Sequence, residues 1–340
     1  METGKEEERM KGIRFGLVLS TIAVFCFLVA WAGMAPSVKA QDKTVIRVGS
    51  PFKAGHILVD AAEKFKELVT QRSAGRIEVQ IDAGSKAEIE INKLNSAGGL
   101  EMQSNGTNFL EAYAPPYYFF TGPYVMKDFG HYMRAWDGKL GQQAQAEMEK
   151  NGKLKYLGTV YRGLRQTTAK KPLYTPADVS NLKLRLPPIP SWIAVWKAIG
   201  ADPVALPLPE LYPGLKSGKA DASEGDLPQI SSFKLNEVQT HLIMTNHLVQ
   251  TGGMLINKPF FDGLSKADQT LVADAAKEAC DWANTKMKTG ENAYLLDLQR
   301  KGMQVVIPDA DAFRLKAKPA VEELFQKQWS VTTWAEVLAQ

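Results

Sequence analysis

The sequence predicts an α/β fold in which one long helix ties two lobes together. Three observations carry this prediction. The folded region opens with a strand, a helix and a second strand, which is typical of a parallel sheet. The chain of 340 residues, 45% hydrophobic and 23% charged, is long enough to bury two cores. An unbroken helical pattern over 265–301 is longer than one lobe is wide.

Residues 11–40 have the pattern of a secretory signal peptide. Lys11 and Arg14 precede an uncharged run over 15–36, and Val38-Lys39-Ala40 places small residues where signal peptidase cleaves. The mature chain would then begin at Gln41, outside the cytoplasm. An uncleaved membrane anchor is the alternative, because about 20 apolar residues are enough to span a bilayer.

The first lobe opens with the β-α-β unit. Alternating apolar residues predict strands over 45–49 and 77–81, and the helix between them ends near Arg72. A further helix is expected over about 88–95. The next segment, 98–123, is rich in Gly, Asn, Pro and aromatic residues, and we expect it to contribute to ligand selectivity.

Two segments are expected to cross between the lobes. A helix over 129–151 precedes a strand over 155–160, after which the chain passes into the second lobe, and a strand over 248–257 returns to the first. The first lobe is thus predicted to comprise 41–160 and about 250–284, and the second 161–249 and about 285–340.

The second lobe contains a short strand that ends at a proline pair. Residues 182–186 alternate apolar and basic side chains, and Pro187-Pro188 stops the strand just after Arg185. Open α/β sheets bind ligands at the carboxyl ends of their strands, where Arg185 would lie. Two helices follow, one capped by Ser191 and stopped by Gly200, and one over 210–217 before another glycine.

The long helix has recognisable ends. Ser265, with Asp268 three residues later, predicts its start, and Gly302 predicts its stop. At about 1.5 Å per residue it would exceed 50 Å, so we expect it to run along both lobes. A strand over 305–307 and an amphipathic helix over about 310–329 close the chain.

Composition and motifs exclude several classes of function. The net charge is only +4 and the body of the chain has no Lys/Arg block, so nucleic acid is not an expected partner. Removal of the leader takes Cys26 and leaves Cys280 alone, expected as a buried hydrophobe. The sequence has no nucleophile elbow, zinc-protease motif or phosphate loop. We therefore expect a binding protein and not an enzyme, without a cofactor or metal site; Asp309 and Asp311 fit a helix start.

Arg165 and Arg185 are the natural receptors for an acidic ligand. A guanidinium offers a rigid fork of donors that matches a carboxylate or a sulfonate, and it keeps its charge. Several runs around these arginines also match a known family in order and spacing. They are Gly163-Leu164-Arg165-Gln166-Thr167-Thr168, Leu182-Lys183-Leu184-Arg185-Leu186-Pro187, Ile199-Gly200-Ala201, Glu210-Leu211-Tyr212, Gly218-Lys219-Ala220-Asp221 and Thr245-Asn246-His247.

With these runs the chain resembles the DctP-type solute-binding proteins of tripartite ATP-independent periplasmic (TRAP) transporters. The resemblance implies a two-lobed, type II-like periplasmic binding protein with a ligand cleft between the lobes. It implies that Arg185 forms the principal salt bridge to the ligand and that Arg165 assists. Alternatively, Arg165 is a structural arginine paired with an acidic neighbour. Glu224 and His247 match positions behind the ligand arginine, where His247 would be a core residue or a ligand contact.

The sequence departs from this family within the expected site, where Leu208 also replaces an aromatic residue that often packs over the ligand. Where the family has Glu-Asn-Pro, this chain has Glu224-Gly225-Asp226, so an amide that usually touches the ligand is missing. Asp226 either points into the cleft, where it accepts a hydrogen bond from the ligand, or caps a helix and faces solvent. Trp192 and Phe52 are expected as walls of the pocket, and Asn108 as a polar contact from the first lobe; each could instead be core.

The resemblance implies a periplasmic protein that delivers its ligand to one small and one large integral-membrane TRAP subunit. The ligand would be a small organic anion, a carboxylate or a sulfonate, with isethionate as the specific expectation. Alternative ligands are a C4-dicarboxylate or another hydroxy or keto acid. A sensory ligand-binding protein that presents its ligand to a membrane receptor remains open, as does a secreted enzyme on the same scaffold.

Overall fold

The computed structural model describes residues 43–340. The predicted signal peptide, the alternative membrane anchor and Cys26 lie outside the described residues. Within residues 43–340 no helix is long and apolar enough to cross a membrane.

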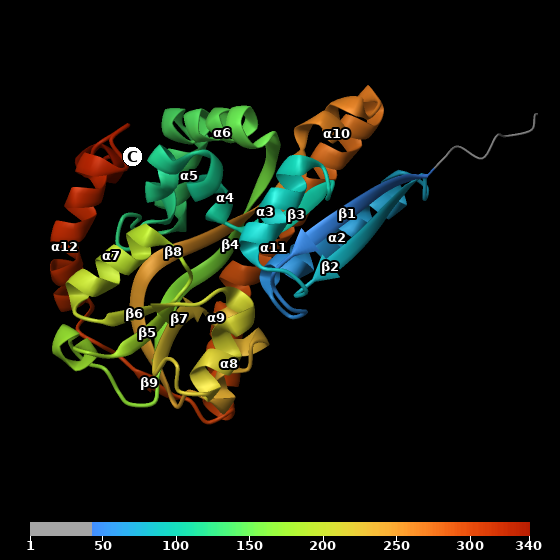
Figure 1. Ribbon diagram of the computed structural model, residues 1–340. Helices are drawn as coiled ribbons and strands as arrows, with labels where there is room; N and C mark the ends of the chain where they lie inside the picture. Colours follow the sequence, from blue (N-terminus) through green and yellow to red (C-terminus); the bar gives the residue numbers. More distant parts are fainter. Residues whose placement is uncertain (1–42) are drawn as a thin grey trace, which may run out of the picture. The chain divides into compact units, whose positions relative to one another are not determined.

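One mixed sheet forms the centre of this part of the chain (Figure 1). Among residues 43–340 it has nine strands in the order β2-β1-β3-β8-β4-β7-β5-β6, with β9 beside β8. β1 pairs in parallel with β2 and β3, as the opening pattern predicts, and β5 pairs in parallel with β6 and β7. The strands are β1 Thr44–Ser50, β2 Ile77–Ala83, β3 Met102–Gly106, β4 Leu154–Ala169, β5 Lys183–Leu186, β6 Asp202–Ala205, β7 Ala222–Asp226, β8 His241–Asn257 and β9 Gln304–Val306.

Two long antiparallel strands, β4 and β8, run side by side through both halves of the sheet (Figure 1). They are 16 and 17 residues long, so the strands predicted over 155–160 and 248–257 are parts of longer ones. β8 pairs with β3 at one end, and β4 pairs with β7 at the other. Their continuity joins the two lobes; the residue boundaries given for each lobe stay a prediction.

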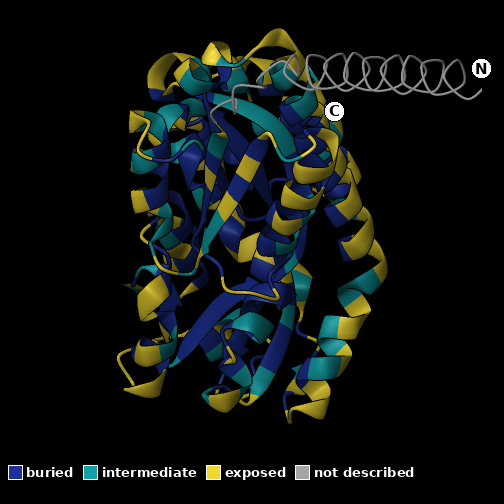
Figure 2. Ribbon diagram, turned by 90° about the vertical axis from the view of Figure 1, so that its right-hand side faces the viewer, coloured by how far each residue is buried: buried dark blue, intermediate teal, exposed yellow. Residues whose placement is uncertain are grey.

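Helices cover the sheet, and their outer faces are exposed while the strands beneath them are buried (Figure 2). The helices are α2 Ile57–Arg72, α3 Glu88–Ala97, α4 Asn108–Tyr113, α5 Phe129–Asp137, α6 Lys139–Gly152, α7 Pro190–Ile199, α8 Leu211–Lys216, α9 Leu227–Ser232, α10 Lys258–Gly263, α11 Lys266–Arg300, α12 Ala310–Lys327 and α13 Trp334–Leu338. Four short 3-10 helices are η1 Pro115–Thr121, η2 Pro176–Val179, η3 Leu208–Glu210 and η4 Leu235–Glu237. The segment 98–123 thus contains β3, α4 and η1.

The predicted long helix is confirmed as α11, of 35 residues. The Ser265 hydroxyl accepts a hydrogen bond from the Asp268 amide at 3.1 Å, and the chain leaves the helix through Gly302 at φ 94°. α11 packs on α2, β4 and α9, so it contacts both halves of the sheet. Cys280 lies buried in α11, where burial raises the pKa of its thiol.

Two expected helix features are wrong. The helix predicted over 129–151 is two helices, because the extended backbone of Gly138 separates α5 from α6. A side chain on Gly141 would collide with the Trp136 carbonyl at 1.8 Å, so the close approach of α6 to the end of α5 requires glycine. Ser191 does not cap α7: the helix starts at Pro190, whose fixed φ suits a first turn, and the Ser191 hydroxyl is buried without a partner in the described chain.

Candidate functional site

A polar cavity lies beside the carboxyl end of β5 and the bulged segment of β4. The space between its lining atoms, including the part open to solvent, amounts to about 340 Å³. Its charged lining residues are three arginines and one glutamate. Of the predicted site residues, five line it: Phe52, Asn108, Arg165, Arg185 and Trp192.

A bulge in β4 brings two arginines to the same side of the strand. In a regular strand Arg162 and Arg165, three residues apart, would point to opposite faces. The register with β8 shifts between Tyr161 and Gly163, which leaves Arg162 as the extra residue, and Gly163 takes φ 94°. Both guanidinium groups therefore line the cavity.

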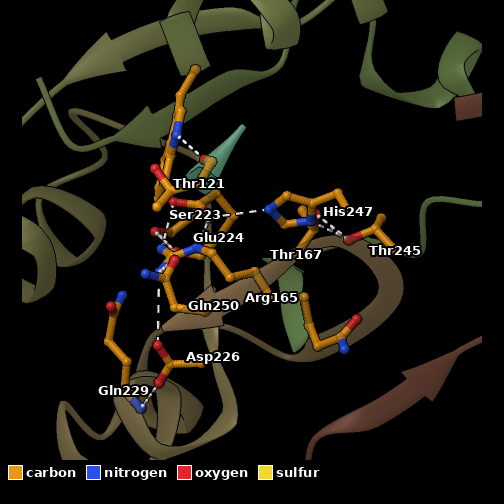
Figure 3. Close-up of polar contacts among 12 residues, drawn as sticks. Thr121, Arg165, Thr167, Ser223, Glu224, Asp226, Gln229, Thr245, His247 and Gln250 are labelled. Carbon is orange, nitrogen blue, oxygen red and sulfur yellow. Dashed lines mark hydrogen bonds and ion pairs between the residues drawn. The ribbon is translucent and has the colours of Figure 1, made fainter. Parts of the chain in front are cut away.

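Arg165 is paired with a buried carboxylate (Figure 3). Its Nε and Nη2 donate to the two carboxylate oxygens of Glu224, the second at 2.7 Å, and its Nη1 donates to Gln250 Oε1 at 3.2 Å. Behind Glu224, His247 Nε2 lies 3.1 Å from Oε2, and Thr245 Oγ1 lies 2.8 Å from His247 Nδ1. Burial opposes ionisation of Glu224, but Arg165 and His247 outweigh it and lower its pKa to about 2.

Asp226 is a helix cap and a buried counter-ion at once. Its Oδ1 accepts from the Gln229 amide at 2.9 Å at the start of α9. Its Oδ2 lies 2.6 Å from Arg162 Nη2 and 3.7 Å from Arg165 Nη1. Burial disfavours the charge, yet the arginines hold the pKa of this carboxyl well below its usual range. Asp226 therefore caps a helix, which is one of the two predicted alternatives, but it does so in the protein interior and not in solvent.

His56 and Phe52 support Arg162 from the first half of the sheet. The Phe52 ring stacks on the His56 ring at 3.9 Å between centroids, and the Arg162 guanidinium lies 4.4 Å from the Phe52 centroid. His56 caps α2 by accepting from the Leu58 amide through Nδ1 at 3.1 Å, so its proton is on Nε2, 3.4 Å from Asp226 Oδ1. Burial lowers the pKa of His56 to about 4, and the imidazole is neutral.

Arg185 has a different environment from the other two cavity arginines. Its Nε and Nη2 donate to the Leu206 carbonyl at 2.9 and 2.7 Å. In the part of the chain that the structure describes, no carboxylate oxygen lies within 4.0 Å of it. Burial lowers the pKa of its guanidinium to about 10, which leaves it charged at neutral pH. Arg185 thus presents its positive charge to the cavity without a carboxylate of the described chain at salt-bridge distance.

Trp192 and Asn108 also line the cavity. Trp192 Nε1, on α7, donates to the Thr121 carbonyl of η1 at 2.8 Å, and its ring lies 4.9 Å from the Arg165 guanidinium. Asn108 Nδ2 donates to Glu88 Oε2 at 3.3 Å. Four other predicted residues do not line the cavity: Glu224, Gly225, Asp226 and His247. The side chains of Glu224, Asp226 and His247 instead bind an arginine, a backbone amide or one another.

Comparison with known proteins identifies the family of this chain. The family model described as "Bacterial extracellular solute-binding protein, family 7" (DctP) matches residues 48–328. The chain belongs to the DctP family. Its members are solute-binding proteins of TRAP transporters and not enzymes.

Relatives of the DctP family resemble this chain over nearly its full length. The 2,3-diketo-L-gulonate-binding periplasmic protein YiaO of Escherichia coli K12 is 28% identical over 324 residues, 94% of this chain and 95% of that protein. A TRAP periplasmic solute-binding protein of Polaromonas sp. JS666, bound to D-erythronate, has a TM-score of 0.82 at 25% identity and covers 87% and 99% of the two chains. One from Fusobacterium nucleatum, with bound sn-glycerol-3-phosphate, has a TM-score of 0.81 at 28% identity, over 87% and 96%.

The sequence did not single out several residues of this DctP-family cavity. They are Glu88, Tyr118, Arg162, Gln229 and Gln250. A signal existed for Arg162 alone, since a glycine directly after it, inside a strand pattern, indicates a bulge. Glu88 has the pattern of an ordinary acidic residue in the first turn of a helix, and Tyr118 is hidden in an aromatic run.

Arginines and carboxylates are distributed unevenly around the cavity. The three arginines face two ionised carboxylates behind the wall, Glu224 and Asp226, and Arg185 has neither of them within 4.0 Å. Glu88 also lines the cavity, and burial raises the pKa of its carboxyl against the opposing effect of the three arginines. Across residues 43–340 no group of His, Cys, Asp and Glu side chains has the arrangement of a metal site. The cavity is therefore suited to an anion.

Proposed function

We propose that this protein captures a small hydroxylated organic acid in the periplasm and delivers it to the small and large integral-membrane subunits of a TRAP transporter. Arg185 binds the acidic group of the ligand. Arg165 contributes a weaker contact, because Glu224 already occupies two of its nitrogens.

The observation that carries the proposal is the missing carboxylate at Arg185. A buried guanidinium without a counter-ion costs several kcal/mol, and Leu206 supplies only a neutral carbonyl. A bound carboxylate, sulfonate or phosphate would supply the missing charge and accept a charge-assisted hydrogen bond. The role of Arg185 therefore requires a ligand, whereas those of Arg162 and Arg165 do not.

The rest of the cavity favours hydroxyl groups on the ligand. Glu88, Asn108, Tyr118 and Gln229 offer donors and acceptors away from Arg185. The ligands named for the Polaromonas and Fusobacterium proteins, D-erythronate and sn-glycerol-3-phosphate, each combine one acidic group with hydroxyls. Isethionate, a hydroxylated sulfonate, fits the same description and is our specific proposal. A C4-dicarboxylate fits less well, because the other two cavity arginines, Arg162 and Arg165, already pair with Asp226 and Glu224, so its second carboxylate would lack a cation of its own.

Ligand binding would be coupled to closure of the two lobes. The hydrogen bond from Trp192 to Thr121 joins α7 to η1 beside the cavity, and Phe52 reaches Arg162 from the other half of the sheet. A ligand that contacts both walls stabilises the closed form by its difference in affinity for the two forms. The closed form would be the one that docks on the membrane subunits.

Thermal unfolding of the mature chain, residues 41–340, tests the binding role. The panel contains isethionate, glycolate, D-erythronate and succinate, each with wild-type protein and with Arg185→Met. A ligand at about 100 times its dissociation constant adds about 2.7 kcal/mol, which shifts the midpoint by several degrees. We expect a hydroxylated acid to shift the wild type and not the variant. An equal shift of both proteins, or none with any acid, would contradict the proposal.

Uptake into membrane vesicles that contain both TRAP subunits tests the delivery role. We expect the purified protein to support ion-gradient-driven uptake of the acid that it binds. Binding without uptake would instead favour the sensory alternative, and chemical conversion of the bound acid would favour an enzyme.

A further inference from the structure

A buried side-chain amide at the cavity wall has a donor group that no other group in the described chain uses. We propose that Gln229 is a specificity-determining residue, whose amide NH2 donates a hydrogen bond to a second oxygen of the ligand, away from the group held by Arg185. Gly225 makes the space for this amide. The inference rests on the proposed function and deepens it, because it names what the ligand must carry besides its acidic group.

The backbone of Gln229 is held rigidly. It is the third residue of α9, and its amide N–H donates to the capping carboxylate of Asp226 at 2.9 Å. The side chain is 3% exposed and lines the cavity. The capped helix start fixes the point from which this long side chain extends, and the packing around the buried side chain limits where its amide can lie.

Arg162 fixes which end of the amide faces it. Arg162 Nη2 donates to Gln229 Oε1 at 3.5 Å and lies 2.6 Å from Asp226 Oδ2. A rotated amide would place its NH2 against this cationic donor, so the oxygen faces Arg162 and the nitrogen points elsewhere. That nitrogen is buried and has no hydrogen-bond partner within residues 43–340.

An unpartnered buried NH2 group has a consequence for ligand choice. Such a group costs about 1–3 kcal/mol when it stays unpaired. A ligand oxygen in the cavity would pair it, whereas a ligand without that oxygen would leave it unpaired. A site of this kind rejects the analogue that lacks the oxygen more strongly than an apolar pocket rejects a missing methylene.

Gly225 is required for this arrangement. A Cβ atom at Gly225 would lie 2.6 Å from Gln229 Nε2 and 3.1 Å from its Cδ. Any side chain at this position would push the amide away from its present place. Because the obstructed atoms are at the far end of a flexible side chain, Gly225→Ala should fold while moving the donor. The two residues therefore act as one unit.

The matching ligand chemistry is an acidic group together with a separate acceptor oxygen, a hydroxyl or a keto oxygen. Calorimetric titration compares pairs of acids that differ by one hydroxyl: isethionate with ethanesulfonate, and glycolate with acetate. The proteins are the wild type, Gln229→Met, Gly225→Ala and the double variant. Gln239→Met is the matched control, since it removes a buried amide that does not line the cavity.

We expect the wild type to prefer the hydroxylated acid, and Gln229→Met to reduce that preference by about 5- to 100-fold. Gly225→Ala should reduce it similarly, and the double variant should show no further loss, because both changes remove one contact. Gln239→Met should keep the wild-type preference.

If Gln229→Met binds the acids with the wild-type preference, the role of its amide is confined to orienting Arg162 and the inference is wrong. Equal loss for both members of each pair has the same meaning, because a purely structural defect does not discriminate between them. If no acid binds in a manner that depends on Arg185, the proposed function itself fails. This failure can be told apart from failure of the Gln229 inference, because it is seen by comparing the wild type with Arg185→Met alone.

Discussion

Arg165 and Arg185 lie on the same cavity, yet their environments are opposite. Arg165, on β4, is surrounded by Glu224, Asp226 and Gln250, and Glu224 raises the pKa of its guanidinium although burial lowers it. Arg185, on β5, has a single carbonyl partner, and burial lowers the pKa of its guanidinium.

The presence or absence of a carboxylate partner distinguishes a buried arginine that stabilises the fold from one that binds the ligand. A guanidinium with its own carboxylate belongs to the fold, because either partner alone would be a buried, unpaired ion. A guanidinium without one has its counter-ion supplied by the ligand. The comparison predicts that substitutions at the first kind affect stability, and that those at the second affect binding.

The largest expected effect follows removal of the paired arginine. Arg165→Met would leave Glu224 buried without its main counter-charge, at a cost of about 3–5 kcal/mol in the free energy of unfolding. Urea unfolding measures it. Adding Glu224→Gln should recover part of the loss, because it removes the stranded charge. Arg47→Met, at an exposed pair with Glu101, should cost no more than about 1 kcal/mol. If Arg165→Met and Arg47→Met lose similar amounts of stability, the buried pair contributes no more to the fold than the surface pair does, which would contradict the prediction.

Acidic pH should lower the free energy of unfolding through the buried histidine and carboxylates that support Arg162 and Arg165, and not through Arg185. The pKa of His56 is about 4 in the folded chain, below the ordinary histidine value of 6.5 that applies when the chain is unfolded. The unfolded chain therefore takes up a proton first as pH falls, so stability present above pH 6.5 is lost progressively down to about pH 4. The loss is roughly 3 kcal/mol. Below that, Glu224, with a pKa of about 2, extends the loss.

Unfolding free energies between about pH 7 and pH 4 check this prediction. His56→Asn, which keeps a helix-capping residue, should reduce the slope, and His247, whose pKa burial also lowers, should account for part of the remainder. His241→Asn, at the half-buried start of β8, should leave the slope unchanged. A wild-type slope that persists in His56→Asn would assign the pH dependence to other groups.

A smaller effect is expected at the bulge that places Arg162 and Arg165 together. Gly163→Ala would hold a Cβ at φ 94° and bring it within 2.7 Å of Glu291 Oε1 and 2.9 Å of Met287 Cε. We expect a loss of about 1–3 kcal/mol in stability. Gly263→Ala, with no atom within 4 Å of the added Cβ, is the control in the same unfolding experiment. If the two variants are equally stable, the bulge does not depend on the conformational freedom of Gly163.

Much of this fold is predictable from sequence because its signals are local. Alternation locates β1, β2 and β5, and Ser265 and Gly302 locate the ends of α11. The extent of β4 and β8 is not predictable this way. The buried residues in the second halves of these strands include polar side chains, which interrupt the alternation of apolar and polar residues. The break at Gly138 depends on a close contact between two helices, which no local pattern records.

The residues of the site likewise divide into those that a local sequence pattern predicts and those that depend on tertiary contacts. Arg185 is predictable because a strand and a proline pair place it at a sheet edge, and the family resemblance implies its role. The pairing of Asp226 with Arg162 is not, because it requires the bulge at Gly163 and the antiparallel register of β4 with β7. Gln229 is missed for a related reason: its amide reaches the cavity only because Gly225, four residues earlier, has no side chain.

The guanidinium of Arg185 is expected to receive its counter-charge from the ligand and not from the protein. The decisive measurement is made on Arg185→Met alone: its unliganded unfolding free energy in urea, and its affinity for the acid that stabilises the wild type. We predict a change in unliganded stability below about 2 kcal/mol, because loss of the bonds to Leu206 is offset by removal of an unpaired buried charge. We predict at least a roughly 30-fold loss of affinity, the size expected for a charged hydrogen-bonded pair. A variant that is strongly destabilised and still binds with wild-type affinity would contradict the account.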